Sequence, residues 1–318
     1  MNEVKPALIA SSPSEGPTIA SSIIRAGAGS LPDFKIFAKS LACEGIGIGE
    51  HYGCLISTWP WAQKYLSDKF ISKHDYSYEH HINVMKELVK RLDLNDATFF
   101  GQDWGGLVGL RVVAEMPDRF ARVVVSNTGM VARGGFPGWI FENAVKFMVW
   151  WNGHVTFDEL KAAADQTLES EEPSPLDGAR MFSKWMAHSY YAEDMDIAAI
   201  ISTFGRIDLS EAEIRAYNAP YPSGEYKSGA HVFPYLIPTQ LRENEEYWVN
   251  VYEKWDKPFL VAFGGDERVT IRMKEDFMTR IPNPTEITLE GVGHFVQEEA
   301  GPELASIIND FIAEGNLD

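Results

Sequence analysis

The alternation of apolar and polar positions predicts a regular succession of strands and helices from Ser67 onward. Residues 97–100 and 121–126 are short runs of apolar or β-branched residues, which predict buried strands because they are too short for helices. Between them, residues 107–116 form a helical run that Pro117 ends. A strand, a helix and a second strand at this spacing form a βαβ unit, which predicts a mostly parallel sheet flanked by helices.

Helical and strand patterns continue on both sides of this unit. Ser77 is a good N-cap residue, and the apolar positions that follow it predict a helix that reaches Leu92. The later predicted elements are a strand at 259–263, a helix at about 271–280, a strand at 285–289 and a closing helix from Glu298 to about Ala313. All of these elements fit an α/β core.

The N-terminal part shows no such pattern. Residues 1–33 are rich in Ser, Ala, Gly and Pro and predict a flexible segment, and 33–43 fit one helix. Residues 44–66 predict neither a strand nor a helix. The Gly-x-Gly-x-Gly at 45–49 is therefore no dinucleotide-binding motif, since no strand precedes it and no helix follows.

The strand pattern also stops between residues 129 and 237, which are helix-like, rich in Trp and Met, and broken at 169–175. This stretch predicts a helical cap domain inserted after the second strand. The core is then formed by residues 34–128 and 238–318.

Composition narrows the classes of partner. The 318 residues carry a net charge of −18, with 28 Lys and Arg against 46 Asp and Glu, which argues against nucleic acid and anionic membranes. Cys43 and Cys54 predict neither a disulfide framework nor a metal site, and the adjacent His80 and His81 do not share a helix face. We expect a cytoplasmic protein, a monomer or weak homodimer, without cofactor or metal.

The turn after the first buried strand carries the candidate chemistry. Gly101-x-Asp103-x-Gly105 between a strand and a helix is typical of a nucleophile elbow, in which glycine tolerates the sharp turn. Asp103 could instead merely cap the helix. Trp104 argues against that reading, since a large aromatic residue in a tight turn has no evident packing reason. A carboxylate at the apex favours attack on a saturated carbon.

Two more groups follow later strands. Asp266 and Glu267 come after the strand at 259–263, and His294 follows the strand at 285–289. Functional residues of open α/β sheets gather in such loops. The order nucleophile, acid, histidine is that of α/β hydrolases.

With these residues in hand, the chain resembles the haloalkane dehalogenases of the α/β-hydrolase superfamily. The matching runs are Ser67-Asp68-Lys69, Asp75 to Tyr78, Gln102 to Gly106, Pro117 to Val123, Tyr217 to Pro222 and Gly293 to Glu298. The resemblance implies an α/β-hydrolase fold with a helical cap. It also implies hydrolysis of a small haloalkane by water to a primary alcohol and halide, through an aspartyl ester.

The resemblance assigns the roles of individual residues. Asp103 is the expected nucleophile, His294 the base, and Trp104 and Trp185 the halide ligands. The family's acid position counts to Glu267, which we favour over Asp266.

Two departures leave alternatives open. Upstream of Leu66 no oxyanion loop is recognisable, as in a deletion or shifted reading frame, and 136–179 has no counterpart in the family. A catalytically impaired homologue therefore stays an alternative. An epoxide hydrolase is another, with Tyr190 and Tyr191 as donors to the epoxide oxygen.

Overall fold

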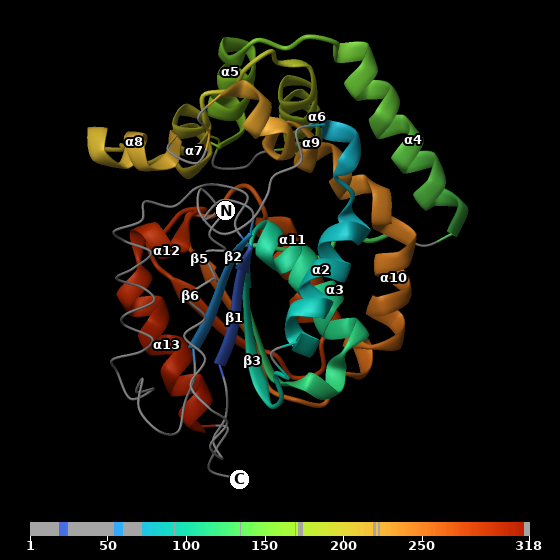
Figure 1. The fold of residues 1–318 in the computed structure, drawn as a ribbon, viewed down its shortest axis with the longest axis vertical. Helices are drawn as coiled ribbons and strands as arrows, with labels where there is room; N and C mark the ends of the chain where they lie inside the picture. The colour runs from blue at the N-terminus through green and yellow to red at the C-terminus, as the bar shows by residue number, and fades with distance from the viewer. Residues whose placement is uncertain are drawn as a thin grey trace, which may run out of the picture.

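The centre of the fold is a parallel β-sheet. A computed structural model describes residues 19–24, 54–59, 72–91, 93–133, 135–168, 170, 174–218, 221 and 223–314. Its six strands pair in the order β2-β1-β3-β4-β5-β6, and every pairing is parallel. The strands are β1 (Ile19–Ile24), β2 (Cys54–Trp59), β3 (Ala97–Gln102), β4 (Phe120–Ser126), β5 (Phe259–Gly264) and β6 (Thr285–Leu289). The predicted parallel sheet is confirmed (Figure 1).

Strands β1 and β2 correct the reading of the N-terminal part. β1 lies within residues 1–33, for which the sequence predicts a flexible segment, and β2 lies within 44–66, for which it predicts no element. Both expectations are wrong at these strands, because β1 pairs with β2 along its whole length and with β3 through Ile19 and Ala20. The adjacent Ser21 and Ser22 interrupt the apolar pattern that would mark a buried strand. The predicted helix at 33–43 and the glycine run at 45–49 lie outside the described residues.

The central strands are buried on both faces, which explains their continuous apolar runs. Successive side chains of a strand point to opposite faces of the sheet. Phe99, Val123 and Val261 pack in one cluster with α2 and α3. Phe100, Val124 and Leu260 pack in another, with α13. The sheet therefore has a helical layer on each side (Figure 1).

Most helices of these layers begin and end near the predicted positions: α2 (Tyr78–Arg91), α3 (Trp104–Glu115), α11 (Ile271–Arg280), α12 (Val296–Glu299) and α13 (Gly301–Glu314). A further helix, α10 (Leu241–Asn250), lies where the sequence predicts no element. The Ser77 hydroxyl accepts a hydrogen bond from the His80 N–H at 3.1 Å, as its predicted capping role requires. The predicted closing helix is divided at Ala300, next to Pro302, whose ring nitrogen has no hydrogen to donate.

The remaining described helices gather beyond the ends of the strands, above α3 and α11 in Figure 1. They are α4 (Gly135–Asn152), α5 (Phe157–Leu168), α6 (Pro175–Tyr191), α7 (Ile197–Gly205), α8 (Glu211–Asn218) and α9 (Ser228–Leu236). Short 3-10 turns span Lys73–Asp75, Pro117–Arg119, Gly224–Lys227, Ile237–Gln240 and Tyr252–Lys254. The predicted break at 169–175 separates α5 from α6, where Ser174 and Asp177 form a capping box. The division of the chain into domains stays a prediction.

No helix in the described part of the chain combines the length and the apolar character that a membrane-spanning segment needs.

Candidate active site

Asp103 occupies a strained turn between β3 and α3. Its backbone angles, φ 48° and ψ −126°, lie outside the common regions for a residue with a side chain. Glycines permit the turn: a Cβ atom at Gly106 would lie 2.0 Å from Thr128 Oγ1, and one at Gly101 would lie 2.8 Å from Gly106 Cα. The turn has the strand, elbow and helix of the predicted motif. Gly106, which follows the predicted Gly105, shows a close approach that excludes a side chain.

His294 lies between two carboxylates. Its Nδ1 is 2.7 Å from Glu267 Oε2, and its Nε2 is 3.9 Å from Asp103 Oδ2. Glu267 is fully buried, and its Oε1 accepts hydrogen bonds from the backbone N–H groups of Val269 and Thr270, the latter at 2.8 Å. The carboxylate is therefore held from both oxygens, and it aims the imidazole at Asp103.

The structure separates the two carboxylates that sequence counting left as alternatives. Glu267 contacts the imidazole, whereas the side chain of Asp266 is exposed and no hydrogen bond to it is found among the described residues. The backbone N–H of Asp266 donates a hydrogen bond to Val292 O at 2.9 Å. Glu267 is the carboxylate in contact with His294, and its role as the catalytic acid stays a prediction.

The pKa values of His294 and Glu267 depend on each other's charge. Burial by itself lowers the pKa of His294, but the carboxylates of Glu267 and Asp103 outweigh burial and raise that pKa well above its ordinary value. Burial by itself raises the pKa of Glu267, but the charge and hydrogen bond of His294 and two backbone N–H groups lower it. An imidazolium between two carboxylates is thus favoured while Asp103 carries its charge.

A buried amide holds the loop that carries His294. Asn127 Nδ2 donates to the carbonyl oxygens of Gly293 at 2.7 Å and His294 at 2.9 Å. Its Oδ1 accepts from the Gly264 N–H at 2.9 Å. Gln102 Nε2 also donates to His294 O, at 3.1 Å. These bonds join the ends of β3, β4 and β5 to the histidine loop, a role that sequence reasoning missed because no local pattern marks a long-range amide contact.

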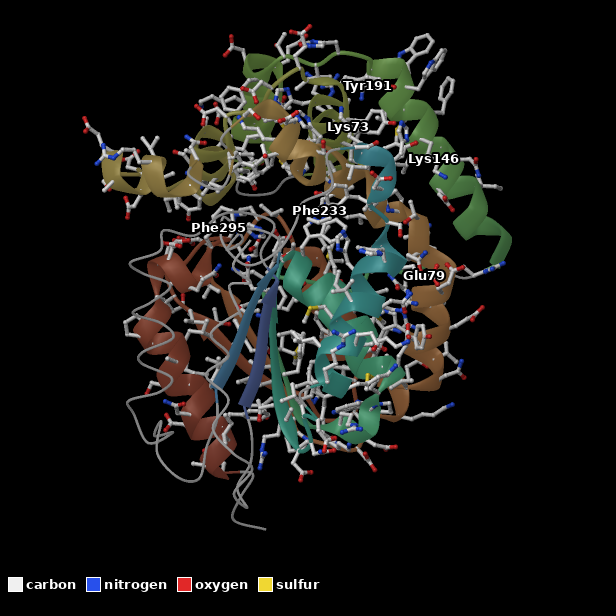
Figure 2. The ribbon with its side chains drawn as sticks, in the orientation of Figure 1. Lys73, Glu79, Lys146, Tyr191, Phe233 and Phe295 are labelled. Atoms are coloured by element: carbon white, nitrogen blue, oxygen red, sulfur yellow. The ribbon has the colours of Figure 1, made fainter. Side chains whose placement is uncertain are left out.

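A cavity of about 350 Å³ opens above Asp103 and His294. Its wall is mostly apolar and comes from both the sheet side and the helices above it. Phe233 and Phe295 lie at this junction (Figure 2) and line the cavity. Within the described ranges, no group of three or more His, Cys, Asp and Glu side chains is placed to hold a metal ion.

Both predicted halide ligands line this cavity. Trp104 is 3% exposed and stacks on Phe233 at a centroid distance of 4.9 Å. Trp185 comes from α6 and packs against Phe204 at 5.1 Å. An indole N–H can only donate a hydrogen bond, so two indole groups in a mostly apolar wall can bind an anion there.

The two tyrosines that an epoxide hydrolase would use lie outside the lining of this cavity. Tyr190 and Tyr191 contact each other at 5.1 Å, and Tyr190 packs on Tyr235 at 4.9 Å. Neither tyrosine is among the described residues that line the cavity with Asp103.

A family model and two named relatives place the chain in one family. The family model of the alpha/beta hydrolase fold matches residues 48–301. A protein named haloalkane dehalogenase from Psychrobacter cryohalolentis is 33% identical over 254 residues, which cover 77% of this chain and 70% of the relative. Haloalkane dehalogenase 1 from Mycobacterium tuberculosis is 32% identical over 247 residues, covering 75% and 68%.

Solved structures agree at the level of the fold. The tetrameric haloalkane dehalogenase DpaA from Paraglaciecola agarilytica superposes with a TM-score of 0.61 at 21% identity, covering 92% of this chain and 83% of that one. A putative ancestral haloalkane dehalogenase gives a TM-score of 0.62 at 15% identity, covering 96% and 94%.

Proposed function

The chain belongs to the haloalkane dehalogenases of the α/β-hydrolase fold, hydrolases that act on carbon–halide bonds, and we propose that it works through an ester of Asp103. One observation carries the proposal: Asp103, the His294–Glu267 pair and two indole groups border a single apolar cavity. The substrates are small haloalkanes, and the products are a primary alcohol, a halide ion and a proton.

Asp103 performs the first step. An ionised carboxylate has no proton to lose and needs no base for its own attack. One of its oxygens displaces the halide from carbon and forms an alkyl ester. The indole N–H groups of Trp104 and Trp185 donate to the departing halide, whose charge grows in the transition state.

His294 performs the second step. Alkylation converts the Asp103 carboxylate to a neutral ester and removes one of the two charges that raise the pKa of His294. The imidazole then more readily gives up its proton and acts as the base for a water molecule. The water attacks the ester carbonyl, so the alcohol leaves with the Asp103 oxygen that displaced the halide, and the oxygen of the water stays in the regenerated carboxylate. Glu267 orients the imidazole and stabilises the imidazolium.

The experiment that tests this function is halide release by the purified full-length protein from a panel of bromo- and chloroalkanes. We expect release from several of them. A folded protein that releases no halide but opens epoxides would replace the proposal with the epoxide alternative. A folded protein without either activity would favour the impaired homologue.

The roles of Glu267 and Asp266 can be separated by one pair of variants. We expect Glu267→Gln to lower kcat by roughly 10²- to 10⁴-fold, the range of acid–base contributions. Loss of this carboxylate also removes a charge that raises the pKa of His294, so the acid limb of the kcat–pH profile moves to lower pH. Asp266→Asn is the matched control and should leave both quantities unchanged. An equal effect of both variants, or a lower kcat with an unmoved acid limb, would contradict the role of Glu267.

The halide role of Trp185 predicts weaker product binding in Trp185→Phe, which keeps an aromatic ring but loses the N–H. A hydrogen bond to a charged group contributes about 1.5–3 kcal/mol. The inhibition constant of bromide should therefore rise by about 10- to 100-fold in steady-state assays. Trp150→Phe, a change at an exposed tryptophan of α4, is the control. An unchanged inhibition constant in Trp185→Phe would remove Trp185 from the halide site.

A further inference from the structure

Two arginines belong to the wall of the cavity above Asp103. Arg268 directly follows the buried Glu267, and Arg272 lies in the first turn of α11. Among the described residues that line the cavity, Asp103 is the one carboxylate. The chain as a whole has the opposite balance, with 46 acidic residues against 28 basic ones. The lining therefore carries an excess of positive charge in a protein whose net charge is negative.

The two arginines lie at the mouth of this cavity. The exposed residues of the described lining are Ser174 and Ala179, at the start of α6, and Arg272. Val269, which lies between the two arginines in the sequence, packs in one cluster with Met181 of α6. The mouth is therefore bordered by the start of α6 on one side and by the start of α11 on the other, and both arginines belong to its rim.

The charge of Arg268 has no partner in the part of the chain that the structure describes. Arg268 is half-buried, yet no hydrogen bond or ion pair to its guanidinium is found among the described residues. The carboxylate of its neighbour Glu267 is already held by His294 and by two backbone N–H groups. Charged groups that are removed from water are normally paired. An unpaired guanidinium on the rim of a cavity is thus placed to receive its partner from a ligand.

The first turn of α11 adds to the positive character of the rim. This helix is 10 residues long, and residues 270–273 at its start all line the cavity. Its N-cap residue Thr270 makes no side-chain capping bond, and the buried Thr270 hydroxyl has no hydrogen-bond partner in the described ranges. The N-terminal end of a helix carries partial positive charge, which favours an anion beside it.

An uncharged haloalkane has no group that uses this rim. We propose that the preferred substrates are haloalkanes with a carboxylate at the end opposite the halogen, and that Arg268 binds this carboxylate. The inference rests on the proposed function, because the halogen end must still reach Asp103, Trp104 and Trp185. The alkyl chain then lies along the apolar wall. A guanidinium suits the other end, since its paired N–H groups match the two oxygens of a carboxylate.

The charge of Asp103 sets a lower limit on the length of such a substrate. Like charges repel, and the repulsion falls as their separation grows. A haloacid whose carboxylate is bonded to the reacting carbon brings that carboxylate next to Asp103. Short haloacids should therefore be poor substrates, and longer ones should improve until the carboxylate reaches Arg268.

Paired substrates test the preference. We would measure kcat/KM for halide release from ω-bromoalkanoates of increasing length and from ω-bromoalkanamides of the same lengths. The amide has nearly the same shape as the carboxylate but no charge. Beyond the shortest chains, the parent protein should favour the carboxylate by about fivefold or more. Added salt should narrow this preference, because ions screen charges at an open mouth.

Variants assign the preference to one residue. Arg268→Gln should lower kcat/KM for the long bromoalkanoates by about 10-fold, the lower end of the range for a hydrogen bond to a charged group, because solvent reaches the rim. The values for the amides should stay unchanged. Arg268→Lys keeps the charge and should retain part of the preference. Arg91→Gln, at the last residue of α2 and outside the lining, is the matched control for net charge.

A binding measurement separates this inference from the proposed function. Octanoate has no halogen, so its binding requires no catalytic step. Calorimetric titration should give a dissociation constant that is about 10-fold higher for Arg268→Gln than for the parent. If the parent binds octanoate in this way but releases halide from no substrate, the carboxylate site stands and the dehalogenase function falls.

Three results would overturn the proposal, provided that circular dichroism shows each variant to be folded. The first is a parent that uses amides as well as carboxylates at every length. The second is an equal loss for both substrate classes in Arg268→Gln, which, with weaker inhibition by bromide, would assign Arg268 to halide release. The third is an equal effect of Arg91→Gln, which would assign the preference to the net charge of the protein.

Discussion

We expect Asp103→Asn to abolish halide release while the protein stays folded. The substitution keeps the shape of the side chain and the tolerance of asparagine for the positive φ at this turn. It removes the charged oxygen that attacks carbon, and removing the nucleophile of a hydrolase costs on the order of 10⁶-fold in kcat. Halide release should therefore fall to the level of a blank without enzyme, as measured with an ion-selective electrode.

The control is the folded state of the variant. Thermal unfolding should show that Asp103→Asn is about as stable as the parent, and intact-mass measurement verifies that the amide persists. Halide release that continues in this variant would show that another group, or water itself, attacks the carbon. The ester of Asp103 would then be wrong even though the family assignment stands.

His294→Gln should leave the first step intact and stop the second. Asp103 needs no base for its own attack, so each chain should release one halide and then stall. Loss of a general base lowers turnover by up to about 10⁴-fold. The stalled protein should gain the mass of one alkyl group, and peptide mapping should locate the group on Asp103.

Two further measurements sharpen this result. His154→Gln, a change at an exposed histidine, should turn over normally. In the parent enzyme, a single turnover in water enriched in heavy oxygen should label the carboxylate of Asp103, because water attacks the ester carbonyl. A folded His294→Gln that turns over at the parent rate, or a parent Asp103 that stays unlabelled, would contradict the two-step route.

The local elements around the elbow were predictable because each has a local cause. Buried parallel strands such as β3 and β5 read as continuous apolar runs, and Ser77 and Pro117 mark where helices begin and end. The same rule failed at β1, whose Ser21 and Ser22 carry no apolar signal. That strand is defined by its pairing with β2 and β3, which are distant in sequence.

The site residues also divide into those that a local sequence pattern marks and those that only long-range contacts identify. Asp103 and His294 follow strands that the sequence predicts, so their approach at the carboxyl ends of the sheet could be expected. Asn127 could not be identified, because its partners are backbone groups more than 130 residues later in the chain. The choice between Asp266 and Glu267 likewise required side-chain directions, which differ for adjacent residues.

The sequence by itself determined the class of fold, the elbow with Asp103 at its apex, and the order of the groups that follow the strands. These are local features, since periodicity, turn residues and spacing act within a few residues. Only the tertiary structure decided that β1 joins β2 to β3 in the sheet, that Glu267 contacts His294, and that the aromatic residues Phe147, Trp150 and Trp151 of α4 are exposed. Each depends on contacts between distant segments or on which face of a helix is covered, and no local pattern encodes those.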